Sequence, residues 1–161
     1  MKPVCLVLGA GAGIGGTVAA KFAREGYHSC LCRRSDQEGL DRLVKGIEDE
    51  GGSANGYLIN AIEENVLEEL ITKVESEVGP IEVVVYNLGA QTGMKLLDKT
   101  SLKEYEWGWR MASLGLFRVA KVLCPIMKER GKGTILVTSA TAAMRGNATQ
   151  HSHAAAMGAR R

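Results

Sequence analysis

The most constraining feature of this sequence is a glycine-rich stretch between a short apolar run and a helical pattern near the N-terminus. Residues 4–8 are apolar, and residues 9–16 read Gly-Ala-Gly-Ala-Gly-Ile-Gly-Gly. This order predicts a strand, a tight turn and a helix start, whose N–H groups and dipole favour a diphosphate. Glycine at Gly9, Gly13 and Gly15 allows a sharp turn and a close backbone approach to a ligand. A tight turn without any ligand would give the same pattern, so the rest of the sequence must show whether this turn belongs to a strand–helix–strand unit that binds a dinucleotide.

Apolar runs and amphipathic helical patterns alternate along the chain. Alternation of this kind is typical of an α/β fold with a Rossmann-like, doubly wound parallel sheet, for which we expect the strand order 3-2-1-4-5. A binding site would then lie at the carboxyl ends of the first and fourth strands, where the order reverses. The expected strands are 4–8, 27–32, 54–59, 81–86 and 134–138, and the expected helices are 14–25, 63–78 and 101–130, with another between Asp36 and Gly51.

Length, charge and cysteine content restrict the class of protein. The 161 residues predict a single domain over 1–161, and the helical pattern near residue 153 predicts a domain that is incomplete at its C-terminus. A net charge of +2 with no basic run points away from nucleic acid, and no apolar segment is long enough for a membrane span. The cysteines match no zinc spacing and predict reduced thiols in the cytoplasm; they are Cys5, Cys30, Cys32 and Cys124.

Three stretches together resemble the short-chain dehydrogenase/reductase family over essentially the whole chain. Gly9, Gly13 and Gly15 match its Gly-x-x-x-Gly-x-Gly turn. Residues 87–90, Asn-Leu-Gly-Ala, resemble the segment that follows the family's fourth strand, and residues 135–139 resemble the strand that ends in its catalytic serine. The resemblance implies a dinucleotide-binding oxidoreductase whose sheet continues into further C-terminal strands that this sequence lacks.

The resemblance also bears on the choice of cofactor. Family members that use NAD generally carry an acid after the second strand, whereas this chain has Arg33 and Arg34 there. Two guanidinium groups suit a 2′-phosphate, so we expect NADP in preference to NAD, although arginines after a strand can also be simply solvated. Asn60 stands where the family usually has an adenine-contacting Asp. The expected cofactor-binding residues are Gly9, Gly13, Ile14, Gly15, Arg33, Arg34, Asn60, Asn87 and Gly89.

The catalytic positions depart from the family's Asn, Ser, Tyr and Lys. Ser139 is present, but the best alignment places Ala112, His153 and Met157 at the other three positions. Met157 cannot be cationic and therefore cannot lower the pKa of a neighbouring acid. His153 could act as the general acid beside Ser139, because imidazole exchanges protons near neutral pH. The alternative is that His151 and His153 are exposed residues at a helix start with no role.

Three functions remain open from the sequence. The first is an NADP(H)-dependent oxidoreductase acting on a small carbonyl compound or alcohol, with Ser139 and His153 as catalytic residues. The second is a catalytically degenerate dinucleotide-binding protein, and the third is a structural or assembly subunit. Trp107 and Trp109 would suit a homo-oligomer that forms through the helix 101–130. No metal site is expected, because His151 and His153 have no third ligand nearby.

Overall fold

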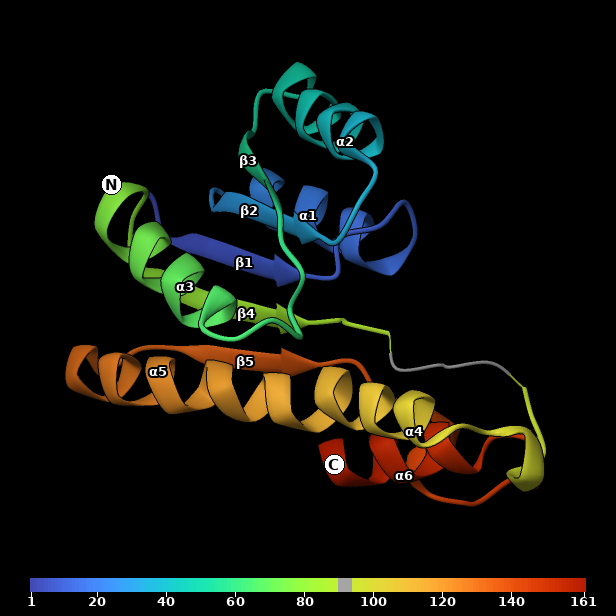
Figure 1. The fold of residues 1–161 in the computed structure, drawn as a ribbon. Coiled ribbons are helices and arrows are strands. Elements are labelled where there is room, and N and C mark those ends of the chain that lie inside the picture. Colours follow the sequence, from blue (N-terminus) through green and yellow to red (C-terminus); the bar gives the residue numbers. More distant parts are fainter. Residues whose placement is uncertain (90–93) are drawn as a thin grey trace.

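The computed structural model describes residues 1–89 and 94–161 of the chain. Within these residues, five strands form one parallel sheet in the order β3-β2-β1-β4-β5, which confirms the predicted topology (Figure 1). The strands are β1 Val4–Leu8, β2 His28–Arg33, β3 Ser53–Leu58, β4 Ile81–Tyr86 and β5 Thr134–Val137. The helices are α1 Ile14–Arg24, α2 Gln37–Asp49, α3 Val66–Glu77, α4 Leu102–Trp109, α5 Gly115–Arg130 and α6 His151–Arg160.

The central strand β1 is buried on both faces, and its alternate residues pack into two different cores. Val4, Leu6 and Leu8 face the core that includes residues of α3 and α5. Cys5 and Val7 face the core made with α1 and α2, which lie on the opposite side of the sheet (Figure 1). Burial on both faces explains why the strand reads as a continuous apolar run rather than as an alternating pattern.

The two edges of the sheet are β3 and β5. Leu136 and Val137 of β5 are 43% and 40% exposed, so this strand is much less covered than β1 or β4. In the part of the chain that the structure describes, no helix combines the length and the apolar character needed to cross a bilayer.

The start of α3 differs from the prediction because of one backbone conformation. The sequence predicts a helix from Glu63, but the helix begins at Val66. Asn65 precedes it with a φ of +63°, in the left-handed region, which interrupts regular helix geometry. Asparagine adopts this region more readily than most residues, so residues 63–65 form a turn that leads into the helix.

The long helix predicted over 101–130 is present, but it is not a regular α-helix along its whole length. A π-helical segment, Arg110–Leu114, lies between α4 and α5. The wider turn of this segment shifts the register between the faces of α4 and α5. Tyr105 and Trp109 of α4 are 48% and 42% exposed. The buried positions along this helix are Gly108, Ala112, Gly115, Val119, Leu123 and Met127.

Tyr86, the last residue of β4, anchors this π-helical segment to the sheet. Its ring is fully buried, and its hydroxyl donates to the backbone oxygen of Met111. Burial raises the pKa of Tyr86 to about 12, so the hydroxyl stays protonated as a donor at ordinary pH. Gly115 makes room for it, since a Cβ atom there would lie 2.2 Å from the tyrosine oxygen.

We expect Gly115→Ala to destabilise the protein by about 1–3 kcal/mol, because the added methyl displaces the buried Tyr86 hydroxyl. Gly46→Ala in α2 is the matched control, since a Cβ at Gly46 meets nothing within 4 Å. Helix propensity alone should make that control neutral or more stable by up to about 1 kcal/mol. Urea unfolding of both variants measures the difference. Equal stabilisation by the two substitutions would contradict the close packing at Gly115.

Candidate functional site

In the turn between β1 and α1, the backbone passes so close to other backbone atoms at two positions that only glycine fits. Gly9 has a φ of +96°, and a Cβ there would lie 2.5 Å from the carbonyl oxygen of Asn87. A Cβ at Gly15 would lie 2.2 Å from the oxygen of Gly9. Gly13 is the N-cap of α1 and makes no side-chain cap, and Ile14 is 64% exposed. The N–H of Gly16 already donates to the oxygen of Gly11 at 2.8 Å. The N–H groups of Ile14 and Gly15, at the start of α1, lack an intrahelical acceptor and are available to an external anion.

Asn87 fixes this turn against β4. Its side-chain Nδ2 donates to the backbone oxygen of Gly9 at 2.9 Å, and its own N–H donates to the oxygen of Leu8 at 2.8 Å. On the other side, the N–H groups of Gly9 and Ala10 donate to the oxygen of Cys32 at 2.9 and 2.8 Å. The turn is thus held between the carboxyl ends of β2 and β4.

A cleft of about 460 Å³ opens at these carboxyl ends, where the strand order reverses. It brings together several residues that the sequence singled out with others that it did not. Gly13, Ile14, Gly15 and Asn60 are not among its lining residues. The lining residues are Gly9, Gly11, Arg33, Arg34, Ser35, Asn87, Leu88, Gly89, Trp107 and Met111. Ala90, the last residue of the predicted Asn-Leu-Gly-Ala segment, lies outside the described residues.

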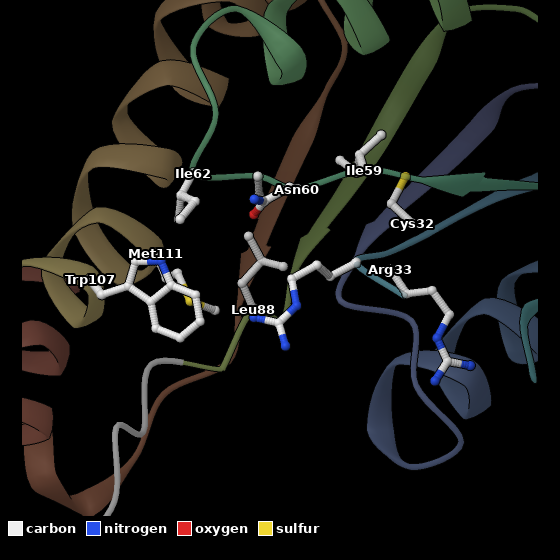
Figure 2. Close-up of a pocket in the computed structure, with 10 residues that line it drawn as sticks. Cys32, Arg33, Ile59, Asn60, Ile62, Leu88, Trp107 and Met111 are labelled. Atoms are coloured by element: carbon white, nitrogen blue, oxygen red, sulfur yellow. The ribbon is translucent and has the colours of Figure 1, made fainter. Parts of the chain in front are cut away.

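A smaller pocket of about 40 Å³ adjoins the cleft and contains Asn60. Figure 2 shows Trp107 and Met111 extending from the long helix on one side, with Ile59 and Asn60 on the segment that follows β3. Leu88 lies between these two groups in the same view. The two cavities share five lining residues, so they form parts of one concave region; these are Arg33, Arg34, Leu88, Trp107 and Met111.

Arg33, the last residue of β2, and Arg34, which follows it, have different partners. Nη2 of Arg33 forms an ion pair with Oδ2 of Asp36 at 2.9 Å. Asp36 is also the N-cap of α2, where its Oδ1 accepts from the N–H of Gly39 at 2.8 Å. The guanidinium carbon of Arg34 lies 5.4 Å from the centre of the Trp107 ring, which is a cation–π contact.

Arg118 of α5 holds the segment that carries Asn60. Its guanidinium pairs with both carboxylate oxygens of Glu68 in α3, at 2.8 and 2.6 Å. It also donates to the backbone oxygens of Ala61 and Glu63 at 3.3 and 2.9 Å. Bidentate pairing of this kind has a fixed geometry, so Arg118 fixes one wall of the smaller pocket.

The predicted catalytic residues do not line the cleft. Ser139 follows β5 and is exposed, and His153 lies half-buried in the first turn of α6. The Nδ1 atom of His153 is buried and has no hydrogen-bond partner among the described residues. Ala112 and Met157, which stand at the Asn and Lys positions of the alignment, instead form a small buried apolar cluster together with Ala156.

Arg160 is a buried cation that no pattern in the sequence predicts. Its side chain donates to the backbone oxygens of Ala112 at 3.1 Å, Thr138 at 3.2 Å and Leu88 at 2.7 Å. Its guanidinium carbon also lies 5.2 Å from the centre of the Tyr86 ring. Burial lowers the pKa of Arg160. Arg160 thereby ties the end of α6 to the segments that follow β4 and β5, beside the cleft.

The side-chain groups that could bind a metal do not converge. Across residues 1–89 and 94–161, no group of three His, Cys, Asp or Glu side chains is placed to hold a metal ion. All four cysteines are free thiols. Cys5 and Cys30 are buried, and that burial raises the pKa of each to about 12, which makes them unreactive as thiolates.

Comparisons with known proteins agree with this architecture. The sequence model of the family described as short chain dehydrogenase matches residues 3–160. The 3-oxoacyl-(acyl-carrier-protein) reductase FabG of Thermotoga maritima is 31% identical over 154 residues, which cover 94% of this chain and 61% of that protein. This chain therefore spans less than two thirds of the length of that relative.

Solved structures give the same result for the fold. A short-chain dehydrogenase from Rhodopseudomonas palustris matches with a TM-score of 0.91 and 30% identity, over 99% of this chain and 74% of that one. A gluconate 5-dehydrogenase from Burkholderia cenocepacia, in complex with NADP and tartrate, matches with a TM-score of 0.86 and 27% identity. The second match covers 98% of this chain and 61% of the other.

We expect Glu68→Gln to lower stability at pH 7 by about 1 kcal/mol, because it removes the charge that Arg118 pairs with. The hydrogen bond from Arg118 lowers the pKa of Glu68, so the pair stabilises the fold above the unfolded-state pKa of about 4.3. That contribution disappears as the pH falls through the folded-state pKa. Urea unfolding should therefore show a difference in stability between the unmodified chain and Glu68→Gln at pH 7 that becomes smaller at low pH.

Glu25→Gln is the matched control for this experiment. Glu25 forms an exposed pair with Lys21 on the same helix, at side-chain exposures of 59% and 65%. Exposed pairs contribute little, so this variant should change stability little at either pH. A gap for Glu68→Gln that persists unchanged in acid would show that the loss comes from packing and not from the ion pair.

Proposed function

Because the chain belongs to the short-chain dehydrogenase family, we propose that it binds NADP(H) and acts as an oxidoreductase on a small carbonyl compound or the corresponding alcohol. One observation carries this proposal. The glycine turn, the segment after β4 and the two arginines after β2 line a single cleft at the switch point of the sheet. Concave sites of this kind in doubly wound sheets are where dinucleotides bind.

The residues in the cleft suit the parts of a dinucleotide. The start of α1 adjoins Gly9 and Gly11 at the edge of the cleft, and its N–H groups at Ile14 and Gly15 suit the diphosphate. Gly9 is already in a conformation that a side chain would block. Asn60, in the adjoining smaller pocket, suits an edge of the adenine ring, because an amide can both donate and accept there. The similar gluconate 5-dehydrogenase is in complex with NADP, which supports the same class of cofactor here.

The catalytic step would depend on Ser139 and His153. When bound, the cofactor supplies the hydride. His153 would donate a proton to the carbonyl oxygen as a general acid, and the Ser139 hydroxyl would polarise the same oxygen with a hydrogen bond. Met157 and Ala112 supply neither a cation nor a polar atom, so we expect slower chemistry than a complete Asn-Ser-Tyr-Lys set would give.

A second candidate function is dinucleotide binding without catalysis. The buried apolar cluster of Ala112, Ala156 and Met157 favours it, because the alignment puts polar catalytic groups at two of these positions. Such a chain would keep the cleft and lose the chemistry, as a sensor or as a subunit of an assembly. Turnover measurements on a chain shown to bind the cofactor separate the two candidates.

Association and location remain predictions. We propose a homo-oligomer that forms through the helix 101–130, on which Tyr105, Trp109 and Phe117 are 48%, 42% and 63% exposed. Such aromatic side chains are enriched at interfaces. Trp107, by contrast, lines the cleft. A cytoplasmic location, proposed from the cysteines, fits the free thiols at all four positions.

The proposed cofactor preference predicts a selective loss. We expect the chain to bind NADPH more tightly than NADH, and the double substitution Arg33→Ala with Arg34→Ala to weaken NADPH by about tenfold or more, with little effect on NADH. Nicotinamide fluorescence titrations measure both. Arg42→Ala is the control, because Arg42 is an exposed residue of α2 that does not line the cleft. Equal weakening of the two cofactors would contradict the phosphate assignment.

The proposed acid predicts a loss of turnover. In a screen of carbonyl substrates that follows NADPH absorbance, we expect His153→Ala to lower kcat by about 10²-fold without weakening NADPH binding. His151→Ala is the control, because His151 is engaged with the Thr100 hydroxyl at 3.1 Å and has no assigned role. Unchanged turnover in His153→Ala would remove His153 from the mechanism. Binding with no turnover of any substrate would favour the second candidate function.

A further inference from the structure

Arg33 and Arg34 follow one another in sequence, but their charges are not equally available. Arg33 is paired with Asp36 at 2.9 Å, and its side chain is 20% exposed. Asp36 is held in place, because it caps α2 by accepting from the N–H of Gly39. A phosphate approaching Arg33 would therefore meet a fixed carboxylate beside the guanidinium. The repulsion between the two anions offsets much of what Arg33 could contribute.

Arg34 lies over a neutral surface. Its guanidinium lies 5.4 Å from the centre of the Trp107 ring, and both side chains line the cleft and the smaller pocket. An indole face attracts a guanidinium without neutralising its charge. The ring also brings no carboxylate beside the guanidinium, in contrast to Asp36 beside Arg33.

We propose that Trp107 is a positioning residue that holds Arg34 at the cleft, so that Arg34 rather than Arg33 confers the preference for a 2′-phosphorylated cofactor. This inference rests on the proposed function, because it concerns how that function's cofactor is selected. Trp107 acts through Arg34 and touches no reacting atom.

The helix that carries Trp107 is well placed for this role. A capping box fixes its start. The Ser101 hydroxyl oxygen accepts from the N–H of Glu104, and the Glu104 carboxylate accepts from the N–H and the hydroxyl of Ser101. Trp107 therefore projects from a fixed helix, while Arg34 lies just beyond the end of β2 and has more conformations to choose from. The ring restricts those conformations before any ligand arrives, which reduces the entropy lost on binding.

The test measures the dissociation constants of NADPH and NADH for the full chain, using nicotinamide fluorescence. We expect Trp107→Leu to reduce the NADPH-over-NADH preference by about threefold, the size of an exposed cation–π contact. Trp107→Phe retains an aromatic face and should keep most of the preference. Trp109→Leu is the matched control and should leave the preference unchanged, since Trp109 is exposed and lines neither cavity.

The coupling to Arg34 is tested by a double-mutant cycle. Arg34→Ala should reduce the preference by about tenfold, and more than Arg33→Ala does. In the Arg34→Ala background, Trp107→Leu should cause no further reduction, because the residue it acts through is gone. Reductions that multiply in the double variant would overturn the proposal, because Trp107 would then act independently of Arg34.

Further outcomes separate this inference from the proposed function. If the unmodified chain binds neither cofactor, the proposed function fails and this inference fails with it. If NADPH binds preferentially but Trp107→Leu leaves the preference intact, only this inference is overturned. Equal weakening of both cofactors by Trp107→Leu also overturns it, because that result assigns Trp107 to the shape of the pocket rather than to Arg34.

Discussion

The candidate site depends on the close approach between Gly9 and Asn87. The backbone of the glycine turn lies so near Asn87 that no side chain fits between them, and two hydrogen bonds hold Asn87 to the end of β1 and to the turn. This contact joins β1 to β4 where the strand order reverses, so it determines where the cleft opens. The helix start, the arginines and the smaller pocket are all placed relative to it.

The two halves of the site rest on different kinds of interaction. The half proposed to bind the cofactor is built from backbone geometry and charged side chains, and its residues line one continuous concave region. The half beside α6 is built around the apolar packing of Ala112 and Met157. Apolar packing can hold α6 in place, but it cannot move a proton or polarise a carbonyl. The structure therefore supports binding more directly than catalysis.

The sheet and the binding turn could be predicted from sequence, because their signals are local. β4 runs from Ile81 to Tyr86 as predicted, since a strand buried on both faces reads as a nearly continuous apolar run, which here is broken only by Glu82. The orientation of Trp107 and Trp109 could not be predicted, because the π-helical segment beyond them shifts the helix face. A regular helical period assumes that the buried face continues without a shift, and the residue types at 110–114 do not predict a π-helical turn.

The interactions of individual side chains could not be predicted from the sequence either. Arg33 pairs with Asp36, whose φ of +71° lies in the left-handed region, and the residue types indicate neither the pair nor the backbone conformation. The burial of Arg160 was equally hidden, because an arginine near a chain end ordinarily reads as solvated. Both interactions depend on the path of the backbone, which the residue types alone do not predict.

The bonds of Arg160 give the docking of α6 an all-or-none character. One guanidinium reaches three carbonyl groups that belong to separate segments of the chain, at Leu88, Ala112 and Thr138. A slip of α6 by one residue would rotate this side chain by about 100° around the helix axis and break all three bonds together. We therefore expect α6 to detach as a unit from the segments that follow β4 and β5, rather than to shift along them.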